Sequence, residues 1–163
     1  MQLPPPKTAS DLFANTVRFR DAYHAMLRPL CQKAQLPPIA LDILLFFANN
    51  PDCDTASDVC RCRGLKPTLV SFHVDRLVSE GLLERRAVAG DRRKTSLALT
   101  DRAAWIVDEG RSLQQRFSQE LTRGLSEADL AHLRTCIAAF DRNIDRIRAG
   151  LTDPDAESEE THD

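Results

Sequence analysis

The sequence contains no apolar run long enough to span a bilayer and no N-terminal secretory signal. Its most apolar segment, residues 39–48, is about half as long as a transmembrane helix must be. These absences predict a soluble, cytoplasmic protein that makes no contact with a membrane. A chain of 163 residues with 42% hydrophobic content is long enough to bury one sizeable core and need not be divided.

Signs of catalysis are also missing. The chain has no glycine-rich loop of the kind that cradles phosphate, and its four histidines belong to no nucleophile arrangement. We therefore predict that the protein is not an enzyme and needs no cofactor.

The five cysteines lack the repeated Cys-x-x-Cys spacing of a zinc site, so no metal site is predicted. Structural disulfides are not expected in a chain without a secretory signal. Cys53, Cys60 and Cys62 nevertheless lie within ten residues of one another, beside Arg61 and Arg63, and a neighbouring arginine lowers a thiol pKa and favours the reactive thiolate. Redox sensing is one hypothesis for these three cysteines, and a structural role as small core residues is the other.

The net charge of −2 conceals an uneven distribution. Residues 153–163 contain six acidic residues and no Lys or Arg, so the rest of the chain carries +4. Residues 61–94 contain nine Lys or Arg against four Asp or Glu. This local excess is typical of a surface that meets nucleic acid, although a solvated basic face is the usual fate of a charge run. The acidic, polar residues 151–163 are predicted to be a disordered tail.

Residues 64–100 carry the most informative pattern in the chain. Apolar residues recur at helical spacing from Leu65 to Val78, so one face of this segment can be buried while the other remains polar. Gly81 is suited to end the helix, because glycine tolerates positive φ at little steric cost.

A short hairpin is predicted after this helix. Residues 82–84 and 95–99 alternate as strands do, and the basic segment 85–94 lies between them. A helix followed by a basic-tipped hairpin suits double-stranded DNA, because the helix fits a major groove while the hairpin reaches phosphate or a neighbouring minor groove.

The segment before the helix supports this interpretation. Residues 52–64 predict a helix of about two turns, with Thr55 and Asp58 as a capping pair and Gly64 at its end. A short helix, a glycine-containing turn and a second helix form the helix-turn-helix pattern. Residues 39–48, preceded by two prolines, are predicted to be the central buried helix.

The order of these elements, the run SFHVDRLVSEGLLERR and the Asp91-x-Arg93 pair before a strand ending in Leu99-Thr100 resemble the MarR family of bacterial transcription regulators. The resemblance covers roughly residues 10–149. It implies a homodimer that binds a pseudo-palindromic operator, usually as a repressor, and that is released by a small molecule or by oxidation. The chain departs from the family at Phe72 and His73, where arginine and leucine are common, so the resemblance does not supply the operator sequence.

The fold class that follows is mainly α with a small β-hairpin wing, a winged helix-turn-helix with N- and C-terminal dimerisation helices. We predict a flexible segment at residues 1–9 and a regulator domain at residues 10–150. Within this domain, dimerisation helices at about 10–36 and 101–149 flank a DNA-binding core at about 38–100.

The predicted DNA contacts form two groups, the helix and the wing. Arg93 is expected to contact a minor groove or phosphate, and Asp91 to orient that arginine. Phe72 is expected to touch a thymine methyl, although an aromatic side chain at helical spacing is more often part of a core. The complete set is Lys66, Thr68, Ser71, Phe72, Arg76, Asp91, Arg92, Arg93 and Lys94. Arg85 and Arg86 are secondary phosphate candidates. The alternative function is a winged-helix module that binds protein and never DNA.

Both ends of the chain are predicted to support dimerisation. Apolar residues from Leu130 to Ile147 repeat at alternating steps of three and four, which is the seam of a coiled coil. Ser126 with Asp129 is the expected cap of this helix. In the N-terminal helix, Pro29 is expected to cause a kink or an interruption.

A helix is also predicted from Asp101 to about Arg123, with Thr100 as its cap. A pocket for a small-molecule effector is expected where the dimerisation helices meet the winged domain, with Tyr23, Phe46, Phe47 and Trp105 as candidate lining residues.

Overall fold

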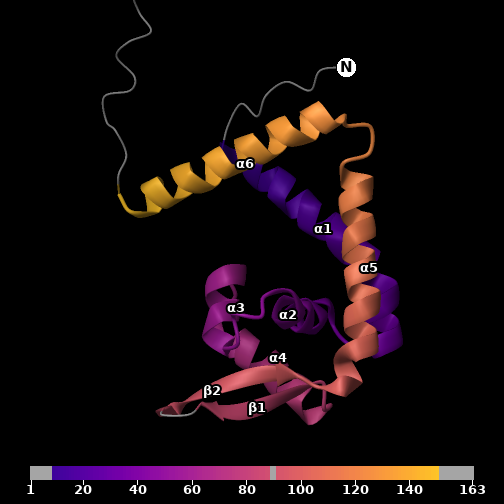
Figure 1. Cartoon of the computed structure of the whole chain (residues 1–163), viewed down its shortest axis with the longest axis vertical. Helices are drawn as coiled ribbons and strands as arrows, with labels where there is room; N and C mark the ends of the chain where they lie inside the picture. Colours follow the sequence, from indigo (N-terminus) through magenta and orange to yellow (C-terminus); the bar gives the residue numbers. More distant parts are fainter. Residues whose placement is uncertain (1–8, 89–90, 151–163) are drawn as a thin grey trace, which may run out of the picture. The chain divides into compact units, whose positions relative to one another are not determined.

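The computed structural model describes residues 9–88 and 91–150, apart from the side chains of residues 9, 10, 12, 13, 88 and 91–94. Most of the predicted segment 1–9 and the whole predicted tail 151–163 lie outside the described residues. The described part is mainly helical with one antiparallel hairpin, as the sequence predicts (Figure 1). Its elements are α1 (Ala9–Ala34), α2 (Pro38–Asn49), α3 (Ala56–Arg63), α4 (Pro67–Ser79), β1 (Leu83–Val88), β2 (Asp91–Leu99), the 3-10 turn η1 (Asp101–Ala103), α5 (Ala104–Leu121) and α6 (Glu127–Arg148).

These elements fall into two compact units, one ending at Ser118 and the other beginning at Gln119. The first unit contains α1 to α4, the hairpin and most of α5. The second contains α6, which has no buried residue. Among the described residues, no single helix meets the length and hydropathy needed to cross a membrane, and α1 with α2 meet them only as a pair bent by 95°.

The core of the first unit is built around α2. Seven of its twelve residues are buried: Ala40, Leu41, Ile43, Leu44, Leu45, Phe46 and Phe47. Each fully buried side chain of the size of Leu, Ile or Phe contributes about 1.5–3 kcal/mol relative to exposure. The one charged residue of this helix is Asp42, which interrupts the apolar sequence.

The helix-turn-helix forms because short-range signals start and stop its helices. Thr55 and Asp58 form a complete capping box at the start of α3, as predicted. Gly64 ends α3 in the left-handed region at φ 63°. Pro67 starts α4, and Gly81 follows its C-terminus at φ 71°. Val59 on α3 and Val70 on α4 are both fully buried in the shared core.

The hairpin is longer than the sequence predicts. β1 and β2 pair in antiparallel fashion from Leu83 opposite Leu99 to Ala87 opposite Thr95, and the register shifts between Ala87 and Val88. The amide of Leu97 donates to the carbonyl of Asp54 at 2.7 Å, which ties β2 to the loop before α3. The hairpin is thereby attached to both ends of the helix-turn-helix, to the loop before α3 through this hydrogen bond and to the end of α4 through the chain itself.

Three further expectations concern the flanking helices. Ser126 and Asp129 form the capping box of α6, as predicted. Pro29 does not interrupt α1, which continues to Ala34. Because proline has no N–H, the carbonyl of Ala25, four residues earlier, loses its helical hydrogen bond, and Ala25 is exposed to solvent. Thr100 occupies the N-cap position before η1, but the predicted capping hydrogen bond of its side chain is wrong. The Thr100 hydroxyl instead donates to the carbonyl of Gly81 at 2.6 Å.

α5 approaches α2 closely at a glycine. A Cβ atom added to Gly110 would lie 2.5 Å from Cδ2 of Leu45, which is fully buried. Gly110→Ala should therefore lower the free energy of unfolding by about 1–3 kcal/mol, because the overpacking outweighs a gain in helix propensity of up to about 1 kcal/mol. Urea denaturation measures this change.

Gln115→Ala is the matched control, since Gln115 is exposed on the same helix. It should leave stability unchanged or slightly raised. A Gly110→Ala protein as stable as the wild type would contradict the close approach of the two helices.

Candidate nucleic-acid interface

α4 separates a buried face from a polar, exposed one. Val70, His73, Val74 and Leu77 are buried. The opposite face exposes Lys66, Thr68, Ser71, Phe72 and Asp75, and the Phe72 side chain is 64% exposed. An aromatic ring of this exposure is not part of the core, which was the alternative for Phe72. Four of the five predicted α4 contacts thus share one accessible surface, which we call the reading face (Lys66, Thr68, Ser71 and Phe72).

The N-terminus of α4 opens toward the reading face. Lys66 is the N-cap residue, and its side chain makes no capping hydrogen bond. Pro67 at the first helical position has no N–H to satisfy. The helix dipole makes this end favourable for an anion such as a phosphate, while the amides of Leu69 and Val70 already donate to the carbonyl of Lys66 at 3.0 and 3.1 Å.

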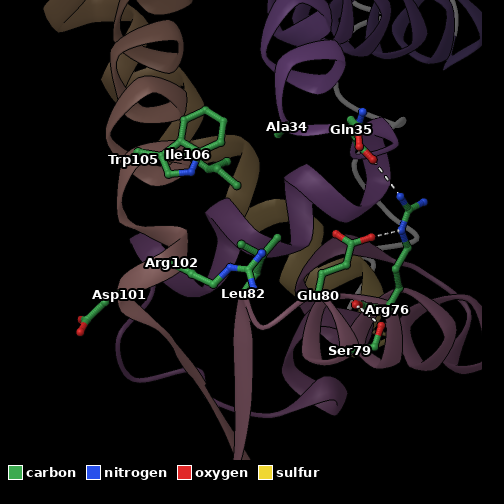
Figure 2. Close-up of a pocket in the computed structure, with 10 residues that line it drawn as sticks. All are labelled: Ala34, Gln35, Arg76, Ser79, Glu80, Leu82, Asp101, Arg102, Trp105 and Ile106. Atoms are coloured by element: carbon green, nitrogen blue, oxygen red, sulfur yellow. Dashed lines mark hydrogen bonds and ion pairs between the residues drawn. The ribbon is translucent and has the colours of Figure 1, made fainter.

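Arg76, the fifth predicted contact on α4, has other partners. Its Nε donates to Glu80 at 2.7 Å, and its Nη2 donates to the carbonyl of Gln35 at 2.8 Å (Figure 2). Gln35 has a positive φ of 54° just after α1 ends. The guanidinium therefore joins the end of α4 to the end of α1.

The hairpin arginines are also partly engaged. Arg85 forms an ion pair with Asp75 of α4, and Arg86 pairs with Glu84 of its own strand. The first pair links the hairpin to the α4 surface. The backbone of residues 91–94 belongs to β2, while the side chains of Asp91, Arg92, Arg93 and Lys94 lie outside the described residues.

His73 is the one buried polar side chain of the described core. It is 7% exposed, and its Nδ1 has no hydrogen-bond partner among the described residues. Burial, with a further contribution from the positive charge of Arg76, lowers the pKa of His73. The imidazole is accordingly held neutral against the core.

The cysteine cluster does not have the electrostatics of an activated thiol at Cys53. Desolvation and then the charge of Asp58 raise the pKa of Cys53, and the opposing effect of Arg61 is smaller. Cys60 is half-buried against the core and Cys62 is exposed. All five cysteines are free thiols in this structure. Within residues 9–88 and 91–150, no three His, Cys, Asp or Glu side chains gather as metal ligands.

A cleft of about 1020 Å³ lies between α1, α2, the end of α3 and α5. Of the four aromatic residues expected to line an effector pocket, Tyr23 lines this cleft. Phe46 and Phe47 are instead buried in the core. Trp105 lines a separate hollow of about 610 Å³ beside Arg76, Glu80 and Arg102 (Figure 2).

Sequence reasoning missed the charged pair in the cleft. Nε of Arg63 lies 3.3 Å from Oδ2 of Asp42, and the Arg63 guanidinium lies 5.2 Å from the ring centroid of Phe46. The one available signal was Asp42 itself, a lone carboxylate in an apolar helix, because such a group needs a partner when it is buried.

Comparisons with known proteins agree with this geometry. A model of the MarR family matches residues 34–94, which extend from the end of α1 into β2. The segment that carries the helix-turn-helix and the hairpin is thus similar to the MarR family.

Solved structures share the fold over most of the chain. A MarR protein from Peptoclostridium difficile DA00132 has a TM-score of 0.73 at 10% identity, over 93% of this chain and 99% of that one. The transcriptional regulator PA3341 has a TM-score of 0.71 at 23% identity, over 85% and 99%. The MepR–DNA complex of S. aureus has a TM-score of 0.65 at 18% identity, over 84% and 96%. This chain thus shares the fold of these three proteins, one of which was solved in complex with DNA.

The buried histidine gives a pH-dependent prediction. Because the pKa of His73 is lower in the folded protein than its ordinary value of 6.5, the unfolded chain takes up the proton first as pH falls. Wild-type stability attributable to His73 is therefore complete above about pH 7 and is lost as pH falls below about 6.5. The free energy of unfolding of His73→Leu, minus that of the wild type, should therefore be larger at about pH 5 than at about pH 8. Urea unfolding of both proteins at the two pH values measures this difference.

His132→Gln serves as the control, since His132 is exposed on α6. It should show no such gain. If the difference between His73→Leu and the wild type were the same at both pH values, His73 would not be held neutral by the fold.

Proposed function

We propose that this chain is a MarR-family transcription regulator, which binds DNA in a sequence-specific manner and acts as a homodimeric repressor on a pseudo-palindromic operator. The observation that carries the proposal is the reading face of α4, exposed beside a hairpin that is tied to the same helix-turn-helix. The likeness to the S. aureus MepR–DNA complex supports the same assignment. A regulator of this kind acts in the cytoplasm and has no catalytic role.

Within this proposal the reading face enters the major groove. Lys66 contacts phosphate or guanine, Thr68 and Ser71 hydrogen-bond to phosphate or a base edge, and Phe72 contacts a thymine methyl. Arg76 supports α4 through Glu80 and Gln35 in place of a direct contact. Arg92, Arg93 and Lys94 of the wing reach phosphate or the minor groove, with Asp91 orienting Arg93.

Dimerisation is supported by the apolar stripe of α6. Five large side chains at steps of four and three residues are 41–62% exposed: Leu133, Ile137, Phe140, Ile144 and Ile147. A row of this kind on a solvated helix is unfavourable unless a partner covers it. A second copy of the chain provides the same stripe and places two reading faces on successive half-sites.

The cleft between α1, α2, α3 and α5 is proposed as the effector site. Its volume is in the range of small-molecule sites, and one of its walls is Arg63, at the end of α3 and next to the turn that leads to α4. Occupation of the cleft is expected to release the operator.

Binding to a duplex from upstream of the gene, compared with random duplex over a range of salt concentrations, tests the proposal. Arg93→Ala should weaken binding and reduce the slope of log affinity against log salt by about 1. Arg116→Ala is the matched control, because it removes the same charge from an exposed position on α5; its binding should equal that of the wild type.

Failure to bind either duplex at low salt would contradict the proposal and favour the protein-interaction module. An affinity for the upstream duplex that changes with a thiol reductant would favour oxidation as the releasing signal, through Cys53, Cys60 or Cys62.

A charge placed in the α6 stripe should prevent dimerisation. Ile144→Glu introduces a carboxylate among apolar side chains, and burying it in an interface is costly. Sedimentation velocity should then show a monomer where the wild type is a dimer. Arg142→Glu, exposed on the same helix but outside the stripe, should remain dimeric. A dimeric Ile144→Glu protein would place the interface elsewhere.

A further inference from the structure

The cleft combines aromatic walls with two carboxylates, an exposed one at Asp21 and a mostly buried one at Asp42. The rings of Phe19 and Phe117 meet edge to face at 5.2 Å, and Phe117 meets Tyr23 at 5.4 Å. The Tyr23 hydroxyl accepts a hydrogen bond from Gln114 at 2.7 Å, which fixes that ring. Asp42 enters the same cleft from α2.

Asp42 has less positive charge around it than its burial requires. Its side chain is 21% exposed, and its one ion pair is the 3.3 Å contact with Nε of Arg63. Burial raises the pKa of Asp42 even though Arg63 and His24 both act to lower it. A carboxylate in this state is stabilised further by an additional cation.

The other charges at the cleft cancel each other. Arg20 and Asp21 pair at 3.2 Å, and both side chains are more than half exposed. Arg63 packs over the Phe46 ring at 5.2 Å, so its guanidinium is already stabilised by Asp42 on one side and an aromatic face on the other. The unmet electrostatic requirement of the cleft therefore belongs to Asp42.

We propose that the cleft binds lipophilic cations, with the charged group beside Asp42 and the apolar body against Phe19, Tyr23 and Phe117. Aromatic faces attract cations, and they do so more strongly when the site is desolvated. An anion of the same shape would meet the negative faces of the rings and the carboxylate of Asp42. This inference rests on the proposed function, for which it names the chemical class of the effector.

The same contact connects the cleft to the DNA-reading helix. Arg63 is the last residue of α3, and Gly64, in the left-handed region, follows it and begins the turn that leads to Pro67, the first residue of α4. A cation beside Asp42 competes with Arg63 for that carboxylate, and so weakens the ion pair that holds the end of α3 to α2 together with the contact between Arg63 and the Phe46 ring. The α3–α4 turn is then free to change its position, so cation binding and operator binding oppose each other, and each lowers the affinity of the other by the same factor.

Tetraphenylphosphonium and tetraphenylborate provide a matched pair of probes, because they share a shape and carry opposite charges. Titration calorimetry with the full chain should show tetraphenylphosphonium binding at least about tenfold more tightly than tetraphenylborate, a difference of about 1.4 kcal/mol. Asp42→Asn should lose at least about tenfold in affinity for the cation. Asp108→Asn, which removes an exposed carboxylate of α5 that does not line the cleft, should bind it as the wild type does.

Equal or tighter binding of tetraphenylborate would overturn the inference and assign the cleft to anions paired with Arg63. Binding of neither probe would also overturn it, as would an Asp42→Asn protein with unchanged affinity for the cation. The comparison of the two probes uses the wild-type chain, so it holds even if Asp42→Asn fails to fold.

Operator binding is measured separately, by titrating the upstream duplex with and without tetraphenylphosphonium. A protein that binds the duplex but not the cation refutes this inference and leaves the proposed function standing. One that binds the cation but no DNA refutes the proposed function instead. Cation binding that leaves DNA affinity unchanged overturns the coupling through Arg63.

Discussion

Burial of α2 is the constraint on which the first unit depends. A helix with seven of twelve residues buried can be stable only if other elements cover most of its circumference. α1 and α4 pack against it, β2 contacts it, and α5 comes so close that one position must be glycine. The elements that carry the reading face and the cleft are therefore held by contact with the same apolar helix.

A polar residue in such a helix has few choices. Asp42 must be ion-paired or neutralised, because an unpaired buried carboxylate is far more costly than a lost hydrogen bond. Arg63 supplies the partner from the end of α3 and also packs on Phe46 of the same helix. The single charged residue of α2 thus forms an ion pair with the end of α3 and places a mostly buried carboxylate in the cleft.

The sequence was most informative where the signal was local. The capping boxes at Thr55 and Ser126 and the stop at Gly64 depend on residues within three or four positions of each other, and the structure confirms them. Pairings between distant residues could not be predicted in this way. Arg76 looked like a DNA contact because it is a cation on a helix, yet Gln35, 41 positions away, accepts its hydrogen bond.

The same limit applies to charge counting. The basic excess of residues 61–94 includes Arg63, Arg76, Arg85 and Arg86, and each of these is paired with a carboxylate of the chain itself. Local charge therefore overstates the number of cations available to a partner. Charge counting does not say which side chains are accessible, since that depends on side-chain geometry.

The exposure of the reading face separates recognition from stability. The side chains of Lys66, Thr68 and Ser71 make no hydrogen bond to the rest of the described chain, and Phe72 is largely solvated. Substitutions at such positions usually change the free energy of folding by less than about 0.5 kcal/mol. Mutation can therefore explore many combinations of these four side chains without loss of the fold. Under the proposed function, a scaffold with this property acquires a new operator sequence in small steps, each of which leaves a folded protein for selection to act on.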